Sequence, residues 1–556
     1  MYDHLEVEKK WQKYWADHET FKTDVWDFSK PKFYALDMFP YPSGVGLHAG
    51  HPEGYTATDI VSRMKRMQGY NVLHPMGYDS FGLPAEQYAV QTGNNPNGFT
   101  QTNIKTFTKQ LQELGFDYDW SKMIATSDPE FYHWTQWIFK QLYKDGYAKY
   151  VDMPVNWCEE LGTVLSNDEV IDGKSERGGY PVIRKNMKQL CIDQAAFAER
   201  LLEGLNEIDW PESTKEMQRN WIGRSTGVEV QFEIVGGGKF SIFTTCIETI
   251  YGITFMVLAP DGDLVQELMP RIKNQDEVKA YIQETVSKSE MDRTELNKGK
   301  TGCRLEGIKA INPVNGREVE VFIGDFVLAN YGTGAVMAVP SHDQRDFEYA
   351  IAHNIDRIQV IEGQDVSEHA FEKQDYLGKG CKLINSEEFT GLTVEEAKVA
   401  ITKKLVDMGI AKETVNYRFR EWIFARQRYW GEPVPIVHLE DGTDYVLPDE
   451  ELPLILPELE DYKGHNGKAP LENATEWKQY NQNGVKGVRE TSTMPGSAGS
   501  SWYYLRYIDP HNDKQLANPE LLKHWMPVDL YVGGPEHAVG HLMYSRIWNN
   551  YLYDKG

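Results

Sequence analysis

The chain has 556 residues, of which 41% are hydrophobic and 25% charged, the composition of an ordinary globular protein. This length exceeds what one hydrophobic core can cover and predicts about three to four domains. The formal net charge of −25 argues against a protein that grips nucleic acid through bulk charge alone, but leaves room for a local basic face that binds a folded RNA.

The N-terminal residues lack the apolar region of a signal peptide, and no apolar run in the sequence reaches membrane-spanning length. We therefore expect a cytoplasmic protein without membrane contact. The cysteines are scattered and form no CxxC pair, which supports neither a structural zinc site nor a disulfide framework. They are Cys158, Cys191, Cys246, Cys303 and Cys381.

Near the N-terminus, Trp11, Tyr14 and Trp15 fall at helical spacing and predict an amphipathic helix whose aromatic residues pack against the fold. Further along, the sequence predicts helices over Asn103–Leu114 and Phe131–Lys144. The second of these is preceded by Ser-Asp-Pro, a typical helix start.

Residues 33–84 carry the most informative pattern. Phe33–Phe39 is typical of a buried parallel strand, and the two prolines and two glycines of residues 40–46 force a loop. A helix with apolar residues at helical spacing should follow, end near Gly69 and lead into an extended segment, Asn71–His74. Its apolar residues are Ala57, Ile60, Val61, Met64 and Met67. Together these elements predict a βαβ unit of a doubly wound nucleotide-binding sheet.

The segment His48-Ala49-Gly50-His51 lies where the loop meets this helix. Ligands of open α/β sheets bind at that edge, and helix N-termini attract phosphate. Two imidazoles with a glycine between them can approach a polyphosphate and donate hydrogen bonds, although paired loop histidines are more often structural. The motif resembles the HIGH signature of class I aminoacyl-tRNA synthetases. Its flanks, MFPYPSG, GHPEGYTATDI and HPMGYDSFGLPAEQYA, are similar to leucyl-tRNA synthetases.

The resemblance implies an α/β fold, a doubly wound parallel, Rossmann-like catalytic sheet interrupted by an inserted mixed α/β editing domain. The implied order is a first catalytic half (1–150), a connective region resembling a zinc module without its cysteines (151–227), the editing insertion (228–416) and a second catalytic half (417–556). Alternating residues over Val228–Val235 and Phe240–Thr244 independently predict strands at the start of the insertion.

The resemblance also assigns a catalytic and ATP-binding site. Its catalytic residues are His48, Gly50 and His51, and its ATP or adenylate ligands are Pro42, Gly46, His48, His51, Gly533, Gly534, Glu536 and His537. We expect Asp529–Val532 to be a strand and Glu536–Trp548 a helix, which places His537 and His541 on one helical face. Because position 538 is alanine, the pair does not match a zinc-protease HExxH motif.

An amino-acid pocket follows from the same resemblance. Asp79, expected at the carboxyl end of a strand, is the implied ligand of the leucine α-amino group, although it is equally typical of a turn. The implied leucine-binding residues are Phe39, Tyr41, Asp79, Ser500, Tyr503, His537 and His541. The aromatic residues among them could equally be core.

The editing motif departs from the family. Where relatives typically have TTRPDT, residues 244–249 read TTCIET, so the arginine, proline and aspartate are all changed. Thr249 remains and would exclude leucine by bulk, while Asp346 would hold the α-amino group of a mischarged residue. The implied editing residues are Thr244, Thr245, Thr249, Met337, His342, Asp343 and Asp346.

The implied reaction is ATP- and Mg²⁺-dependent activation of leucine and its transfer to leucine tRNA by a monomer without structural zinc. The sequence contains no Lys-Met-Ser-Lys-Ser loop. Two alternatives stay open at this point. One is a paralogue that binds leucyl-adenylate or RNA without charging tRNA, and the other is a synthetase for valine, isoleucine or methionine.

Overall fold

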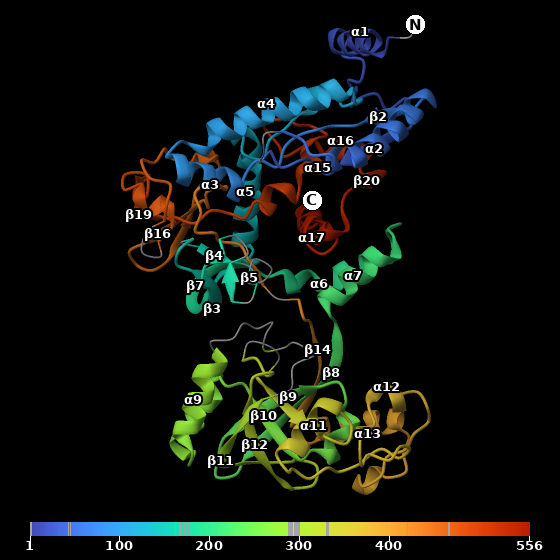
Figure 1. Cartoon of the computed structure of the whole chain (residues 1–556), viewed down its shortest axis with the longest axis vertical. Helices are drawn as coiled ribbons and strands as arrows, with labels where there is room; N and C mark the ends of the chain where they lie inside the picture. The colour runs from blue at the N-terminus through green and yellow to red at the C-terminus, as the bar shows by residue number, and fades with distance from the viewer. Residues whose placement is uncertain are drawn as a thin grey trace. The chain divides into compact units, whose positions relative to one another are not determined.

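The computed structural model describes the chain apart from residues 1–2, 43, 45, 162, 166–169, 172, 176–177, 287–292, 294–300, 330–332, 420 and 465–467. Two residues of the proline–glycine loop, Ser43 and Val45, are thus outside the described residues. The described chain folds as two compact units (Figure 1). Unit 1 comprises Met1–Leu165, Lys185–Trp221 and Phe419–Gly556, and unit 2 comprises Ser166–Arg184 and Ile222–Arg418. The domain bounds given above remain a prediction.

A parallel sheet in the order β2-β1-β20 organises unit 1. β1 (Lys32–Asp37) is the middle strand, and its four C-terminal residues are buried because it has a strand on each side. β2 (Asn71–Leu73) follows through helix α2 (Gly50–Met67), which confirms the predicted βαβ unit. β20 (Leu530–Val532) pairs from the far end of the chain, with Leu36 opposite Tyr531.

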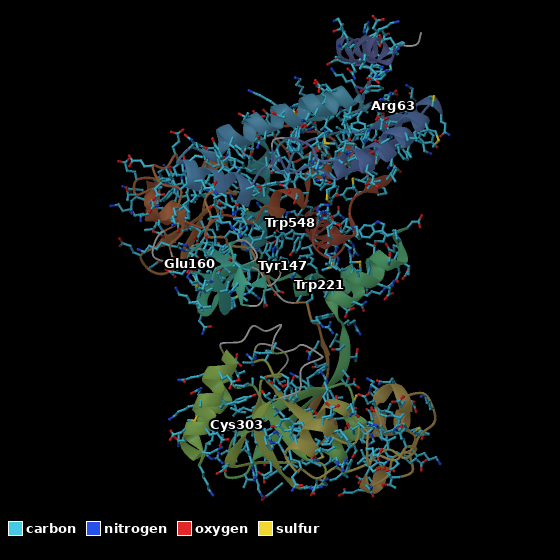
Figure 2. All side chains as sticks on the ribbon, in the orientation of Figure 1. Arg63, Tyr147, Glu160, Trp221, Cys303 and Trp548 are labelled. Carbon is cyan, nitrogen blue, oxygen red and sulfur yellow. The ribbon has the colours of Figure 1, made fainter. Side chains whose placement is uncertain are left out.

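The remaining helices of unit 1 include the two helices that the sequence predicts within residues 103–144. Each of these two starts at a proline. Its largest fully buried side chains include Trp157, Trp502, Trp525 and Trp548; Figure 2 labels the last of these. The helices are α1 (His4–Asp17), α3 (Leu83–Thr92), α4 (Pro96–Leu114), α5 (Pro129–Lys144), α6 (Ala198–Gly204), α7 (Glu212–Ile222), α14 (Ser497–Ser500), α15 (Tyr503–Arg506), α16 (Pro519–Trp525) and α17 (His541–Asp554).

Two further sheets complete unit 1. One has the order β15-β7-β3-β4 and the other, which is antiparallel, β17-β16-β19-β18. The second sheet lies within residues 436–489. The strands are β3 (Ala148–Cys158), β4 (Thr163–Leu165), β7 (Ile183–Ile192), β15 (Trp422–Ile423), β16 (Ile436–Leu439), β17 (Asp444–Val446), β18 (Gln479–Gln482) and β19 (Val485–Arg489).

The predicted N-terminal helix is confirmed as α1, but its predicted packing is wrong for two of the three aromatic residues. Trp11 and Tyr14 are 42% and 45% exposed, and no residue of α1 is buried. Only Trp15 faces the rest of the unit, where the guanidinium of Arg63 lies 4.9 Å from its ring centre.

Unit 2 is a mixed seven-stranded sheet with helices. Its path is β13-β10-β12-β11-β8-β14, and β9 pairs with β8 as the predicted hairpin around three glycines. The chain enters along β8 and leaves along β14, which are antiparallel partners, with Ser225 opposite Asn416 (Figure 1). The elements are β5 (Val170–Ile171), β6 (Lys174–Ser175), β8 (Ser225–Ile234), β9 (Lys239–Thr244), β10 (Phe255–Leu258), β11 (Gly302–Ile311), β12 (Glu318–Gly324), β13 (Ala335–Ala338), β14 (Ala411–Asn416), α8 (Asp263–Leu268), α9 (Gln275–Val286), α11 (Gln344–Ala352), α12 (Lys373–Tyr376) and α13 (Val394–Asp407).

Two glycines of unit 1 provide a test of this packing. A Cβ on Gly77 would lie 2.5 Å from the carbonyl oxygen of Ile124 and 2.6 Å from the Tyr507 hydroxyl, whereas one on Gly98 would meet nothing within 4 Å. We expect Gly77→Ala to lower the free energy of unfolding by about 1–3 kcal/mol, because backbone must shift. Gly98→Ala, in the first turn of α4, should raise it by about 0.5 kcal/mol. Urea denaturation followed by tryptophan fluorescence measures both, and equal effects would contradict the packing described.

Candidate active site

The His48–His51 segment forms the entry to α2. The two imidazoles lie face to face, with ring centres 3.8 Å apart, and the backbone N–H of His48 donates to Nδ1 of His51 (3.2 Å). Burial, and then the neighbouring charge of His48, lower the pKa of His51. The N-cap residue is Ala49, which supplies no side-chain acceptor to the first turn. His48 takes that place: its Nδ1 accepts from the N–H of Gly50 (3.2 Å) and its carbonyl from the N–H of His51 (3.1 Å).

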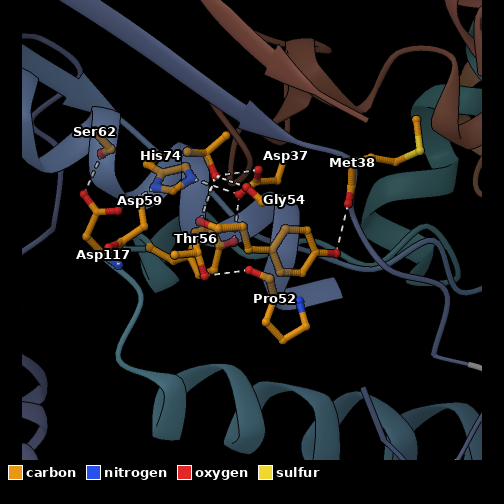
Figure 3. Close-up of polar contacts among 12 residues, drawn as sticks. Asp37, Met38, Pro52, Gly54, Thr56, Asp59, Ser62, His74 and Asp117 are labelled. Carbon is orange, nitrogen blue, oxygen red and sulfur yellow. Dashed lines mark hydrogen bonds and ion pairs between the residues drawn. The ribbon is translucent and has the colours of Figure 1, made fainter. Parts of the chain in front are cut away.

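A buried polar network lies behind this helix start (Figure 3). His74 is completely buried and bonds through Nε2 to Asp37 (3.0 Å) and through Nδ1 to Asp117 (2.6 Å). Asp37 also accepts from Thr58 (2.6 Å) and Tyr118 (2.7 Å). Burial lowers the pKa of His74, but the two carboxylates outweigh it and raise this pKa to about 9. The network therefore holds an imidazolium between two carboxylates at neutral pH.

This network explains why the regularly spaced apolar residues of α2 do not face the fold. The side of the helix that faces the fold buries Tyr55, Thr58 and Ser62, because their hydroxyls bond Met38, Asp37 and Asp117. The apolar residues face outward instead: Ile60 is 61% and Met67 83% exposed. Ala57 and Met64 are exposed as well, and Val61 is half-buried.

The aromatic residues of the predicted amino-acid pocket do come together. Phe39 and Tyr503 stack with ring centres 3.9 Å apart and an angle of 4° between the rings. The Tyr503 hydroxyl donates to that of Tyr531 (2.9 Å), which in turn bonds Nε2 of His541 (2.9 Å). Burial lowers the pKa of His541 to about 3, so its imidazole is neutral. Tyr41 lies at the same edge, where its hydroxyl leaves no room for a side chain at Gly82.

Asp79 lies beside this aromatic wall. Its carboxylate accepts a hydrogen bond from Thr126 (3.2 Å) and one from Ser500 at the end of α14. Burial, partly opposed by these two bonds, raises the pKa of Asp79 to about 7. The described partners of this carboxylate are neutral hydroxyls, so it is suited to bind a cationic ligand.

The chain beyond β20 differs from its prediction. Gly533 and Gly534 do form a turn, but a short 3₁₀ helix, Pro535–His537, comes next and α17 begins only at His541. His537 and His541 therefore do not share a helical face. Glu536 and His537 form a partly exposed pair, with Nε2 and Oε1 3.6 Å apart. The structure joins this turn to the first loop, because the Met38 N–H donates to Val532 (3.2 Å).

In unit 2, the TTCIET segment follows β9 and forms a tight 3₁₀ turn. Thr244 accepts from the N–H of Cys246 (3.0 Å), and Thr249 donates to the Cys246 carbonyl (2.8 Å). Two of the three residues that depart from the family point into the core: Ile247 and Glu248 are both completely buried. Glu248 accepts from Tyr376 (3.0 Å), and burial raises its pKa.

The three residues predicted from the loop after β13 have different surroundings. His342 uses both ring nitrogens inside unit 2, toward the Phe371 carbonyl (2.9 Å) and the Val360 N–H (3.0 Å), and burial lowers its pKa to about 4. Asp343 caps α11, and Asp346 accepts from the Val339 N–H (2.9 Å). Met337, on β13, is half-buried.

Other side chains at these sites gave no sequence signal. Thr126, Tyr531 and Glu432 come from three distant segments, and only the fold brings them to Asp79 and His541. Glu432 is completely buried, and the charge of Asp79 adds to burial in raising its pKa. Within the described ranges, no three His, Cys, Asp or Glu side chains are grouped as metal ligands, and no helix is long and apolar enough to cross a membrane.

Comparison with known proteins gives this geometry a family. The model of the class I tRNA synthetases for isoleucine, leucine, methionine and valine matches residues 10–248, and that of the leucyl-tRNA synthetase editing domain matches residues 219–406. A similar solved structure is the agnB2 leucyl-tRNA synthetase of Agrobacterium radiobacter strain K84, in a ternary complex with tRNA and LeuAMS. It is 34% identical, with a TM-score of 0.85 over 100% of this chain and 66% of its own.

A parallel sheet with the paired histidines at its edge, joined to such an insertion, defines a class I aminoacyl-tRNA synthetase. More narrowly, the chain belongs to the leucyl-tRNA synthetase family. It spans 66% of the length of the solved relative.

The raised pKa of Asp79 predicts a stability effect. Since the folded-state pKa is about 7 against an ordinary 3.8, stability falls as pH rises from about 4 to 7, and the ionised carboxylate destabilises the fold above that. We expect Asp79→Asn to raise the free energy of unfolding at pH 8 by about 2–4 kcal/mol, and by less at pH 5. Urea unfolding at the two pH values measures this. The exposed Asp513→Asn is the control, and a loss of stability in Asp79→Asn at pH 8 would contradict the assignment.

Proposed function

We propose that this chain activates leucine with ATP and transfers it to leucine tRNA. The observation that carries the proposal is the pairing of β1 with β20, which joins the loop bearing His48 and His51 to the turn bearing Gly533 and Gly534. Both turns therefore lie at one sheet edge, where doubly wound folds bind nucleotides. The solved relative, a ternary complex with tRNA and LeuAMS, supports this assignment.

For the ATP phosphates, the chain offers the two imidazoles at the start of α2, whose Nδ1 atoms each accept a backbone N–H. The lowered pKa of His51 keeps it neutral at pH 7, so it would donate a hydrogen bond without adding a charge. In the proposal, His48, Gly50 and His51, with Pro42 and Gly46, face the phosphates, and Gly533, Gly534, Glu536 and His537 face the adenosine. Mg²⁺ bound with ATP would neutralise phosphate charge. Positioning and hydrogen bonding, not a covalent nucleophile, would then promote attack by the leucine carboxylate on the α-phosphate, which breaks the bond to the β-phosphate and gives leucyl-adenylate and pyrophosphate.

For leucine, the same edge offers a carboxylate and an apolar wall. Asp79 would bind the α-ammonium group. Its pKa is raised, and a positive charge beside it would stabilise the ionised carboxylate. Phe39, Tyr41, Ser500 and Tyr503 would surround the side chain, with the neutral His541 fixed behind them through Tyr531. Such a pocket distinguishes substrates by only about 1–3 kcal/mol per methylene, so a second, hydrolytic site is expected.

We assign that hydrolytic role to unit 2, with Thr244, Thr245, Thr249, Met337 and Asp346 as its pocket. Support comes from the match to the editing-domain model and from the position of Thr249, fixed by its bond to Cys246. His342 and Asp343 would support this pocket through their own bonds. The proposed protein is a cytoplasmic monomer without structural zinc.

A second candidate is a paralogue that binds leucyl-adenylate without charging tRNA. The TTCIET segment favours it, because Ile247 and Glu248 are directed into the core and offer no replacement for the polar residues that relatives have there.

Calorimetric titration with LeuAMS tests the synthetic site directly. We expect tight binding of the leucyl compound, and binding of the isoleucyl, valyl and methionyl analogues weaker by about tenfold or more, because each fits the aromatic pocket less well. Tight binding of another analogue would assign the pocket to a different amino acid. Binding of none would contradict the proposed synthetic site.

Deacylation of mischarged tRNA tests unit 2 separately. The chain should hydrolyse leucine tRNA carrying isoleucine or norvaline above background while leaving the leucyl ester intact. Thr249→Ala should make the leucyl ester a substrate too, because it removes the bulk that excludes leucine. Absence of hydrolysis by the unmodified chain would favour the second candidate.

A further inference from the structure

The buried histidine between Asp37 and Asp117 has no part in the function proposed above. Asp37 is the last residue of β1, so the loop that leads to His48 begins at the next residue. Met38 is held on both sides: its N–H donates to Val532 (3.2 Å), and its carbonyl accepts from Tyr55 of α2 (3.1 Å). The position of Asp37 therefore sets where this loop starts.

The Asp37 carboxylate is 2% exposed, and its ionisation in such a place is costly unless a cation is bonded to it. Its hydroxyl partners, Thr58 and Tyr118, are neutral. Among the side chains that the structure describes, the cationic group bonded to Asp37 is the imidazole of His74, at 3.0 Å. The other nearby cation, Arg66, bonds Asp117 instead (3.1 Å).

Each partner of Asp37 belongs to a different element around the helix start. Thr58 comes from α2, His74 follows β2, and Tyr118 follows α4. His74 extends this set to Asp117, which accepts from Ser62 of α2 (2.5 Å). The imidazolium thus ties α2 to the sheet at two points, one turn apart.

We propose that His74, in its protonated form, is a positioning residue for the His48–His51 segment: it bonds the Asp37 carboxylate and so fixes the end of β1 against the first turns of α2. This inference rests on the proposed function for its consequence in ligand binding. His74 touches no ligand itself and acts through Asp37 and the backbone of Met38.

The titratable groups around His74 determine the sign of its pH dependence. Asp37 and Asp117 bond it directly and the Tyr118 ring lies 4.5 Å away, while Arg66 and Asp59 bond Asp117. Because the pKa is raised to about 9 from an ordinary 6.5, the imidazolium is present at pH 7 and is lost as pH rises through about 9. The positioning should be lost over that same range.

The experiment compares LeuAMS affinity in the unmodified chain and in His74→Gln, at pH 7 and at pH 10. The ratio of the two dissociation constants cancels the ionisation of the ligand and of Asp79. At pH 7 we expect the dissociation constant of His74→Gln to be about 10 to 100 times that of the unmodified chain, as for other misplacements of a reacting segment. At pH 10 the two constants should be nearly equal. Ser62→Ala, which removes a bond to Asp117 but keeps the imidazolium, is the matched control, and its ratio should not change with pH.

A ratio that is the same at both pH values overturns the proposal, since a purely structural role would lower stability without this pH signature. Hydrogen exchange of the unmodified chain needs neither ligand nor variant. The protection factor of the amides in residues 46–55, divided by that of the amides in α5, should fall about tenfold between pH 7 and pH 10. The helix α5 serves as the internal reference. An unchanged quotient overturns the proposal even if His74→Gln fails to fold. If LeuAMS does not bind at all while the quotient falls, the proposed function fails and this inference stands.

Discussion

Everything at the candidate site depends on β1 having a parallel neighbour on each side. β2 follows it after one helix, but β20 arrives from the other end of the chain, with Ala35 opposite Leu530. That second pairing brings the paired histidines and the Gly533–Gly534 turn to one edge. It also places Tyr531 where it can link Tyr503 to His541. A strand of three residues thus completes both the nucleotide side and the amino-acid side of the site.

Around the site, polar and charged side chains occupy interior positions that are usually apolar in a protein fold. The inner side of α2 carries hydroxyls that bond Asp37 and Asp117. Asp79 is half-buried and Glu432 completely buried, and both have raised pKa values. Buried carboxylates are expensive unless they are paired or receive a cation. Asp37 and Asp117 are neutralised within the fold by His74, whereas the donors to Asp79 among the described residues, Thr126 and Ser500, are neutral. We therefore assign Asp37 and Asp117 a structural role and Asp79 a role in binding a ligand.

Local sequence patterns predicted β1, α2, α4, α5 and the β8–β9 hairpin, because each shows the periodicity or the end residues of its own element. They did not reach features that a distant partner decides. The apolar residues of α2 face outward because the hydroxyls on its other side bond Asp37 and Asp117. The helix predicted from Glu536 is wrong at its start, because a 3₁₀ helix comes first and α17 begins at His541. The sheet over residues 436–489 forms by pairing of β16 with strands that come later in the chain. Thr126, Tyr531 and Glu432 could not be found from spacing, since their roles arise from contacts across the chain.

The antiparallel pairing of β8 with β14 has a consequence for how the chain reaches its fold. β1 must find β20 across nearly the whole sequence, but the ends of unit 2 are bonded, with the N–H of Arg418 donating to Ile222 (3.0 Å). Once those ends have met, the segment between them no longer lengthens the loop to be closed. The saving in closure entropy is modest, about 0.5 kcal/mol. The order of folding events matters more. If unit 2 folds first, it holds the chain before Ile222 close to the chain after Arg418, as a short linker would, before β1 pairs with β20.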